Sequence, residues 1–331
     1  MNKISIALCT YNGEEHLIEQ LSSIVTQTML PDEIIICDDN STDHSAEIAR
    51  QFLTANFDGH FAIHQNAHNL GFSANFWQAI SLCSGNIICL SDQDDIWMPD
   101  KVSTLVDTLM KHPHVMLAFH DVELVDGHLR LLHKSFWQTM NPVFNYSAFL
   151  ENDYRRLFLG NTIQGSACAI RKELVEIASP LPPNVYHDEW LALTAIVNGG
   201  IFPIPRQLLK YRQENNTIGG LPLSPLQKAA KWTRARKQAA INHRKSLHHL
   251  DTVLNRFKSA SFSKLDHKHA IALKKILQLT EHRTTFIQNP HRIAMFRPSL
   301  YFQTLDPTYA AKELIKDILC AENCPHDDIS Q

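Results

Sequence analysis

The sequence predicts an α/β protein with a mostly parallel sheet, helices on both faces of that sheet, and an α-helical extension at the C-terminus. Three observations support this fold class. Short apolar strands alternate with helical patterns over residues 1–220, which is typical of parallel strands joined by right-handed crossovers. Polar clusters follow several of these strands. From Pro225 onward the pattern is entirely helical.

The first strands and helices are predicted from their periodicity. Apolar runs predict strands at 3–9, 32–37, 61–65, 86–91 and 115–126, the last with a hairpin return over 127–132. Apolar residues at helical spacing predict helices at 14–27, 44–53, 73–83 and 99–112. Ser41, Thr42 or Asp43 would cap the second of these helices, and Pro99 suits the first turn of the fourth.

The elements after residue 134 follow the same logic. Residues 135–160 are aromatic-rich and irregular. The pattern then predicts a strand at 161–170, helices at 171–178 and 186–200, the latter ending at two glycines, and a strand at 202–212. In the extension, two apolar stripes predict a helical hairpin: Leu247, Leu250, Leu254 and Phe257, then Leu273, Ile276 and Leu277.

Composition and charge limit the classes of protein to consider. The 331 residues are 44% hydrophobic and 20% charged, without an apolar run of membrane-spanning length and with an N-terminus that turns polar too early for a signal peptide. We therefore expect a cytoplasmic location. Five cysteines in or beside apolar runs are expected to be buried thiols: Cys9, Cys37, Cys83, Cys89 and Cys168. The pair Cys320 and Cys324, with His326 nearby, is a weak metal signature in an expected disordered tail.

The charge is distributed unevenly along the chain. Residues 225–300 hold 16 Lys or Arg and 3 Asp or Glu, a net of +13, whereas the remaining residues carry a net of −16. Trp232 among Lys228, Lys231, Arg234, Arg236 and Lys237 fits a helix at an anionic membrane surface. A solvated helical face explains the charge equally well. No DNA- or RNA-binding motif accompanies it, so nucleic acid is not an expected partner.

Candidate site residues follow the predicted strands. "TYNGEE" (10–15), "DDNST" (38–42) and "SDQDD" (91–95) come directly after three strands, and "HD" (120–121) lies within a fourth. Ligands of open parallel sheets bind beyond the carboxyl ends of the strands. These clusters therefore predict a binding site at that edge.

Asp92, Asp94 and Asp95 stand within four positions. Like charges at this spacing repel one another, and a divalent cation such as Mn²⁺ or Mg²⁺, which prefers oxygen ligands, would offset that repulsion. The alternative is that these acids cap the helix that begins near Pro99, a role that suits Asp95.

The motifs together resemble a known family. The order "CTYNGEEHL", "DEIIICDDNSTD", "NLGFSANF", "GNIICLSDQDDIWMPDK", "HDEW", "YRQENNT" is similar to the family-2 inverting glycosyltransferases of the GT-A fold, and within them to the rhamnosyltransferase-like group acting on bacterial surface polysaccharides. The resemblance covers residues 1 to about 220. It implies a catalytic domain over 1–220, with residues 221–331 as a basic helical extension outside the family pattern.

The resemblance also implies roles for individual residues. Asp188 in "HDEW" would be the catalytic base, preceded by His187 where the family often has glutamate. Asp94 would bind the metal, and Asp92 the metal or the donor ribose. Asp121 and Asp95 are candidate acceptor or metal contacts. The implied donor contacts are Thr10, Tyr11, Asn12, Glu14, Asp38, Asp39, Asn69, Asp92, Arg212 and Gln213. Asn40 replaces a frequent glycine, and asparagine tolerates the left-handed conformation of that turn.

The implied reaction moves a sugar from a nucleotide diphosphate to a hydroxyl with inversion. The donor would be dTDP-rhamnose or a UDP-sugar, and the acceptor a glycan or lipid-linked glycan at the cytosolic membrane face. Two alternatives remain open: a non-catalytic sugar-nucleotide-binding partner in a glycan assembly complex, and a nucleotidyltransferase. The intact acids argue against the first, and the lack of a glycine- and lysine-rich loop near the start argues against the second. A nicotinamide dehydrogenase is disfavoured, because no G-x-G-x-x-G follows the first strand.

Overall fold

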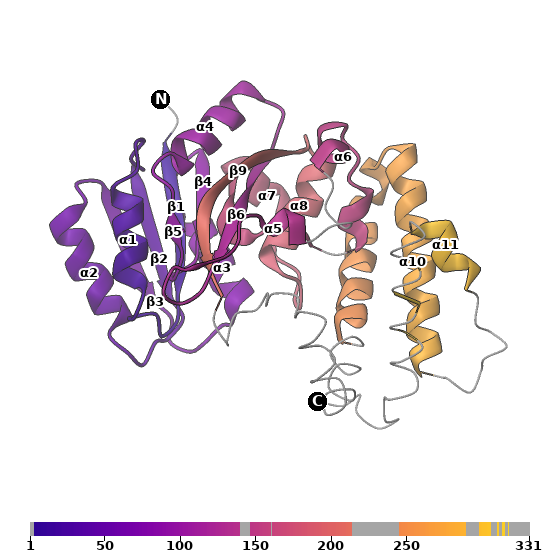
Figure 1. Cartoon of the computed structure of the whole chain (residues 1–331), viewed down its shortest axis with the longest axis horizontal. Coiled ribbons are helices and arrows are strands. Elements are labelled where there is room, and N and C mark those ends of the chain that lie inside the picture. The colour runs from indigo at the N-terminus through magenta and orange to yellow at the C-terminus, as the bar shows by residue number, and fades with distance from the viewer. Residues whose placement is uncertain are drawn as a thin grey trace. The chain divides into compact units, whose positions relative to one another are not determined.

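A computed structural model describes residues 3–139, 146–159, 161–213, 245–288 and 298–305, together with residues 310, 313, 314 and 317 (Figure 1). The chain forms two compact units. The first contains residues 1–154 and 161–220, and the second contains residues 155–160 and 221–331. The predicted functional boundary at residue 220 falls outside the described residues and stays a prediction.

The first unit contains the sheet. Its strands are β1 (Ile4–Thr10), β2 (Glu33–Asp38), β3 (His60–Gln65), β4 (Ile87–Ser91), β5 (Ile96–Trp97), β6 (Leu117–Val125), β7 (Leu131–His133), β8 (Cys168–Arg171) and β9 (Ile201–Arg212). Its helices are α1 (Leu17–Val25), α2 (Ser45–Asn56), α3 (Phe72–Leu82), α4 (Lys101–Lys111), α5 (Phe136–Thr139), α6 (Tyr146–Leu150), the 3₁₀ helix η2 (Gly165–Ala167), α7 (Lys172–Ala178) and α8 (His187–Val197).

The order of the strands creates a crevice. The sheet runs β3-β2-β1-β4-β8-β6-β9-β5, with β7 paired to β6. The chain moves from β1 outward to β3 and then returns to β4 on the other side of β1. Right-handed crossovers therefore place α1 and α2 on one face and α3 on the other. The reversal between β1 and β4 is the topological switch point at which ligands of such sheets bind.

The sheet is mixed rather than mostly parallel. The pairs β1–β2, β1–β4 and β2–β3 are parallel, as expected, and β6 also pairs in parallel with β9 (Figure 1). Strand β8, however, lies antiparallel between β4 and β6, and the short β5 and β7 pair antiparallel as well. The expectation of parallel pairing thus holds for the first four strands, where strand and helix alternate regularly.

Most predicted elements are confirmed, with some exceptions. Residues 135–160, predicted to be irregular, contain the short helices α5 and α6. The predicted strand over 161–170 begins only at Cys168, because Gly165–Ala167 form a 3₁₀ turn instead. Strand β5 was not predicted, since two residues are too few to show a period. Amphipathic helices behave as the periodicity requires: Leu17, Leu21 and Ile24 of α1 are fully buried.

The second unit is helical in its described residues. It contains η1 (Arg155–Leu159), a helix over residues 245–261, η3 (Phe262–Lys264), α10 (His267–Gln288) and α11 (Ser299–Thr304). Of the predicted stripes, Leu247, Leu254 and Phe257 and then Leu273, Ile276 and Leu277 are buried. Arg283 of α10 is buried too, and its guanidinium binds the carboxylates of Asp317 (2.7 Å) and Glu313 (2.6 Å).

Further predictions concern the cysteines, the basic segment and the absence of membrane-spanning segments. Cys9, Cys37, Cys83, Cys89 and Cys168 are buried and free, as expected. Trp232 and its neighbouring cations, as well as the Cys320–Cys324 pair, lie outside the described residues. Within the described part of the chain, none of the helices combines the length and the apolar character that a membrane crossing needs.

Candidate functional site

The loop after β1 is joined to the loop after β4 by one side chain. The Gln93 amide accepts hydrogen bonds from the Thr10 hydroxyl (2.7 Å) and the Tyr11 N–H (2.8 Å), and it donates to the Tyr11 carbonyl (3.3 Å). A Cβ on Gly13 would lie 2.2 Å from the Gln93 oxygen, so any larger residue there would displace the Gln93 side chain. Tyr11 itself stays 48% exposed and available to a ligand at the crevice.

The loop after β1 is also joined to the loop after β2. Asn12, with a left-handed φ of 50°, accepts from the Thr42 N–H (2.9 Å), and Glu14 accepts from the His44 N–H (3.0 Å). These two predicted donor contacts therefore serve the loop structure directly. Asn40 has the positive φ (65°) expected for it.

The acid pair after β2 is buried and bonded. Asp38 accepts from Ser41 and from the Gln65 amide (3.4 Å). Asp39 accepts from the Leu70 N–H (2.7 Å) and the Gly71 N–H (2.9 Å), while the Asn69 amide donates to its carbonyl (3.3 Å). Asp39 and Asn69 thus fix the 69–71 loop at the crevice.

The acids after β4 show the repulsion that the sequence predicted. Burial and, after it, the neighbouring carboxylates of Asp94 and Asp188 together raise the pKa of Asp92 to about 7. Asp95 is fully buried, and its pKa is raised well above the ordinary value by burial, then by Asp94 and Asp92. The prediction that Asp95 caps the following helix was wrong, because the N-cap position is Asp100.

A buried lysine lies under this acid cluster. Lys101, the first residue of α4, is fully buried, donates to the Ser166 carbonyl (2.5 Å) and lies 3.7 Å above the Trp97 ring. Burial lowers its pKa to about 7, and the carboxylate of Asp95 opposes that shift. Both Asp95 oxygens lack a well-aligned hydrogen bond within the described structure. Lys101 therefore supplies the nearby positive charge that partly compensates Asp95.

The candidate base stands at the start of α8. Burial raises the pKa of Asp188 to about 7, although the Glu189 N–H (2.8 Å) donates to its carboxylate. His187 is fully buried and stacks on Phe76 at 4.2 Å, and burial lowers its pKa to about 3. Gly165 leaves room for both: a Cβ there would lie 3.0 Å from His187 Nε2 and 3.5 Å from Asp188 Oδ2.

The end of β9 closes the site with Tyr211, Arg212 and Gln213. Burial and the carboxylates of Asp92 and Asp95 raise the pKa of the Tyr211 hydroxyl. The Arg212 guanidinium donates to the Asp94 carbonyl (2.7 Å), the Gly127 carbonyl (2.6 Å) and the Glu19 carboxylate. Gln213 donates its N–H to the Val125 carbonyl (2.8 Å), extending the β6–β9 pairing.

Asp121 has a different environment from the other acids. Its two oxygens accept four hydrogen bonds, from the Val122 N–H (2.9 Å), the Trp137 N–H (3.0 Å), the Ser135 hydroxyl (2.5 Å) and the Gln207 amide (2.8 Å). A carboxylate with this many donors is suited to holding β6, the 135–137 segment and β9 together. Its predicted acceptor or metal role stays a prediction.

The donor set fits a hard divalent cation. The described residues contain no ready cluster of three His, Cys, Asp or Glu side chains around a metal position. Mg²⁺ and Mn²⁺ sites are, however, commonly completed by one or two carboxylates together with substrate phosphates. Asp92 and Asp94, whose mutual repulsion is visible in the raised pKa of Asp92, meet that requirement.

Sequence reasoning missed Gln93, Gly165, Lys101 and Tyr211. Two of them had a signal. Lys101 occupies the buried face of α4, one turn before Leu105, where an apolar residue is expected, and Gln93 lies inside the acidic motif. Gly165 and Tyr211 gave none, because their importance comes from contacts with residues far away in the sequence.

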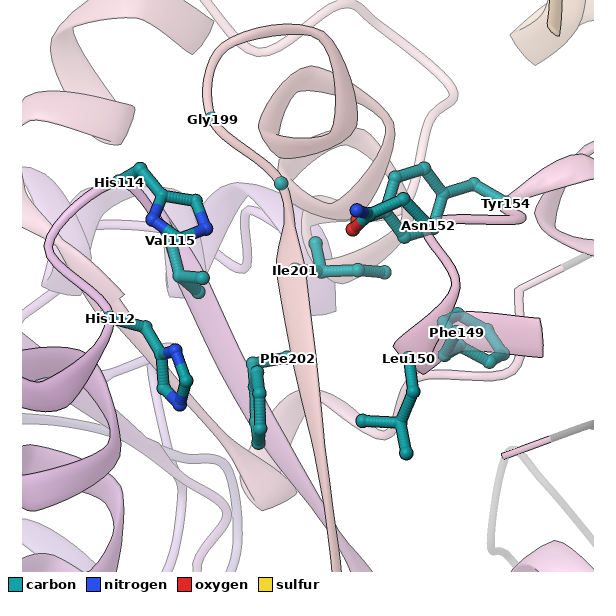
Figure 2. A pocket seen from close by; sticks show the side chains of 11 residues that line it. His112, His114, Val115, Phe149, Leu150, Asn152, Tyr154, Gly199, Ile201 and Phe202 are labelled. Carbon is teal, nitrogen blue, oxygen red and sulfur yellow. The ribbon is translucent and has the colours of Figure 1, made fainter. Parts of the chain in front are cut away.

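A separate cavity of about 220 Å³ (Figure 2) lies near the amino-terminal ends of β6 and β9. His112, His114 and Val115 line it before β6, and Gly199 and Gly200 line it before β9. The His112 ring stacks on Phe202 at 4.3 Å. The cavity contains none of the predicted site residues.

Comparison with known sequences relates the chain to glycosyltransferases. The profile described as Glycosyl transferase family 2 matches residues 5–177. An uncharacterised protein of Mycobacterium tuberculosis is 30% identical over 220 residues, which are 65% of this chain and 60% of that protein. The dTDP-rhamnosyl transferase RfbG of Shigella flexneri is 36% identical over 107 residues, covering 31% of this chain and 37% of that one. The match to the mycobacterial relative thus spans less than two thirds of its length.

Solved structures agree in fold. Staphylococcus aureus TarS with UDP-GlcNAc aligns with a TM-score of 0.56 at 17% identity, covering 97% of this chain and 90% of that one. The mannosyltransferase PcManGT of Pyrobaculum calidifontis, in complex with GDP-Man and Mn²⁺, aligns with a TM-score of 0.56 at 15% identity, covering 97% and 86%. At these identities the alignments establish the GT-A fold.

Proposed function

The chain belongs to glycosyl transferase family 2, and on that premise we propose that it is a metal-dependent inverting enzyme that moves a sugar from a nucleotide diphosphate to an acceptor hydroxyl. One observation carries the proposal. Asp188, the candidate base, is close enough to the acids after β4 to raise the pKa of Asp92. The base and the proposed metal ligands would therefore share one site at the switch point of the sheet.

Asp92 and Asp94 would hold Mn²⁺ or Mg²⁺ at the carboxyl end of β4. The bound ion would neutralise the negative charge that develops on the departing diphosphate. Lys101 and Tyr211 lie close enough to Asp92 to interact with its charge. The Mn²⁺ in PcManGT supports a divalent ion in this role.

Asp188 would accept the proton of the acceptor hydroxyl. A pKa of about 7 suits this role, because a base works best when its pKa lies near the operating pH. His187 is buried and neutral against Phe76, so it would orient the start of α8 rather than exchange protons. Direct displacement by one hydroxyl inverts the anomeric centre, which agrees with the single base.

The nucleoside would lie along the loop after β1. Tyr11 is exposed there, and Thr10 is held by Gln93. Asp39 and Asn69 would shape the base pocket through the 69–71 loop that they fix. The side chains of Asn12 and Glu14 would support that pocket from behind.

The donor and acceptor follow from the relatives. We propose dTDP-rhamnose or a UDP-sugar as donor, supported by the dTDP-rhamnosyl transferase of Shigella flexneri and by the UDP-GlcNAc complex of TarS. The proposed acceptor is a glycan or lipid-linked glycan of bacterial surface polysaccharide synthesis. The proposed location is the cytoplasm, with the basic extension at the membrane face.

The purified full chain would be screened against a panel of nucleotide-sugars, with release of nucleoside diphosphate as the readout. We expect turnover with Mn²⁺ or Mg²⁺ and none in EDTA, and we expect Asp94→Ala to abolish it because the metal loses a ligand. Full activity in EDTA would contradict the metal assignment. Donor binding without any turnover would favour a non-catalytic binding protein instead.

A further inference from the structure

The last residue of β9 joins three separate segments around the acid cluster. Nε, Nη1 and Nη2 of Arg212 each donate to a different partner: the Asp94 carbonyl (2.7 Å), the Gly127 carbonyl (2.6 Å) and the Glu19 carboxylate of α1. The Arg212 side chain is only 2% exposed, whereas Glu19 is 53% exposed. The guanidinium is thus held from three directions and shielded from solvent.

This arrangement limits what Arg212 can do. Three of the five N–H groups of the guanidinium already have acceptors, so a direct contact with a donor diphosphate could use only the second N–H of Nη1 and of Nη2. The carbonyl that it holds belongs to Asp94, the proposed metal ligand. Gly127 follows β6, and β6 pairs with β9 up to Val125 and Arg212. The hydrogen bond to the Gly127 carbonyl therefore anchors the guanidinium to the sheet.

We propose that Arg212 is a positioning residue that fixes the backbone of Asp94, and that Glu19 on α1 orients its guanidinium for this task. The inference deepens the proposed function, because it assigns a residue on α1 to the support of the metal ligands. Charge-assisted hydrogen bonds are stronger and more directional than neutral ones. The Glu19 carboxylate therefore holds the planar guanidinium in the orientation that reaches Asp94.

Glu19→Gln tests the proposal without disturbing the core, because Glu19 is half exposed. Residues that support metal ligands from outside typically contribute about 10-fold to metal affinity. We therefore expect the Mn²⁺ dissociation constant, measured by the electron paramagnetic resonance of free Mn²⁺ with dTDP or UDP present, to rise by about 10-fold. Hydrogen exchange of peptides covering 92–97 should accelerate.

Glu15→Gln is the matched control. It makes the same change of charge on an exposed residue four positions earlier, for which the structure gives no contact with Arg212. It should leave both measurements at wild-type values. Arg212→Lys, which keeps the charge but cannot reach three acceptors, should reproduce the effects of Glu19→Gln, with its thermal unfolding recorded to confirm that it folds.

Two results would overturn the inference. If Glu19→Gln tightens binding of dTDP or UDP and leaves Mn²⁺ affinity and exchange unchanged, Arg212 contacts the diphosphate directly and Glu19 competes for it. If Mn²⁺ affinity, hydrogen exchange of 92–97 and binding of dTDP or UDP all stay at wild-type values in Glu19→Gln, the ion pair has no part in positioning Asp94.

The experiments distinguish a failure of the proposed function from a failure of the inference about Arg212. A wild-type protein that neither binds Mn²⁺ nor releases nucleoside diphosphate would contradict the enzyme assignment. In that event, faster exchange of 92–97 in Glu19→Gln but not in Glu15→Gln would still establish that Arg212 fixes the loop. Unchanged exchange would refute it.

Discussion

At the scale of single residues, the environment of Asp188 differs from that of an ordinary surface aspartate. It is half buried, and burial raises its pKa to about 7. An aspartate with an ordinary pKa would be a poor base at neutral pH, because it would hold a proton weakly. The fold therefore gives this carboxylate the property that proton abstraction requires.

Replacing Asp188 by Asn should lower turnover by about 10²–10⁴-fold, the usual contribution of a positioned base, while the affinity for the donor stays close to wild type. In the wild type, kcat should fall as the pH decreases below about 7, because the base becomes protonated. A pH–rate profile of both proteins checks this, and the residual activity of the variant should not show the fall of kcat below about pH 7. Wild-type turnover in the variant would place the base elsewhere.

Gly165 is a second residue whose role is local. Gly165→Ala would bring a methyl group to 3.0 Å from His187 Nε2, a ring that is already stacked on Phe76. The start of α8 must then shift, and small displacements of a catalytic group cost about 10-fold or more in rate. We expect kcat to fall while binding of the nucleoside diphosphate is retained. An unchanged kcat would show that His187 moves freely.

At the scale of elements, the buried start of α4 stabilises the acidic loop before it. Lys101 donates to the Ser166 carbonyl and partly compensates Asp95. Lys101→Met should therefore lower the free energy of unfolding by about 1–3 kcal/mol, because the Ser166 carbonyl loses its buried donor and Asp95 becomes less compensated. Urea denaturation measures this, with Lys111→Met, an exposed lysine at the other end of α4, as the control.

A double variant separates charge from packing. In Lys101→Met with Asp95→Asn, the uncompensated charge is gone, so the loss should be smaller than in Lys101→Met alone. If the double variant loses as much as the two single variants together, Lys101 and Asp95 are not coupled.

The elements also show what local sequence can predict. Strands β1 to β4 and their helices were predicted because period-2 and period-3.6 patterns are local properties. The insertion of β8 between β4 and β6 was not, since pairing of Cys89 with Ala169 joins positions 80 residues apart. The acids at the ends of β2 and β4 could be placed at the same edge of the sheet because these strands run parallel to β1, as predicted. Lys101, Gly165 and the partners of Arg212 depend on that later insertion and on β9.

At the scale of the whole molecule, charge is separated along the chain. The +13 of residues 225–300 predicts attraction to anionic lipid, worth about 1 kcal/mol per Lys or Arg near the surface and screened over about 8 Å at physiological salt. The full chain should bind vesicles containing phosphatidylglycerol more tightly than vesicles of phosphatidylcholine alone, and binding should weaken as salt rises.

Replacing Lys228, Lys231, Arg234, Arg236 and Lys237 by Gln should weaken vesicle binding and leave hydrolysis of the donor in solution unchanged. Sedimentation with the vesicles measures the first, and nucleoside diphosphate release the second. Equal binding to both kinds of vesicle, or to neither, would assign the charge to solubility or to a protein partner.

The position of β1 between β2 and β4 has a consequence for how the protein is made. On the ribosome, Ile4–Thr10 emerges before both of its neighbours, and the second of them, Ile87–Ser91, is more than 75 residues away. At about 5–20 residues per second, one edge of β1 stays open for several seconds of translation. A chaperone that binds extended apolar segments would find its target in "ISIALC" during that interval, and slowing translation before residue 91 should increase aggregation of the nascent chain.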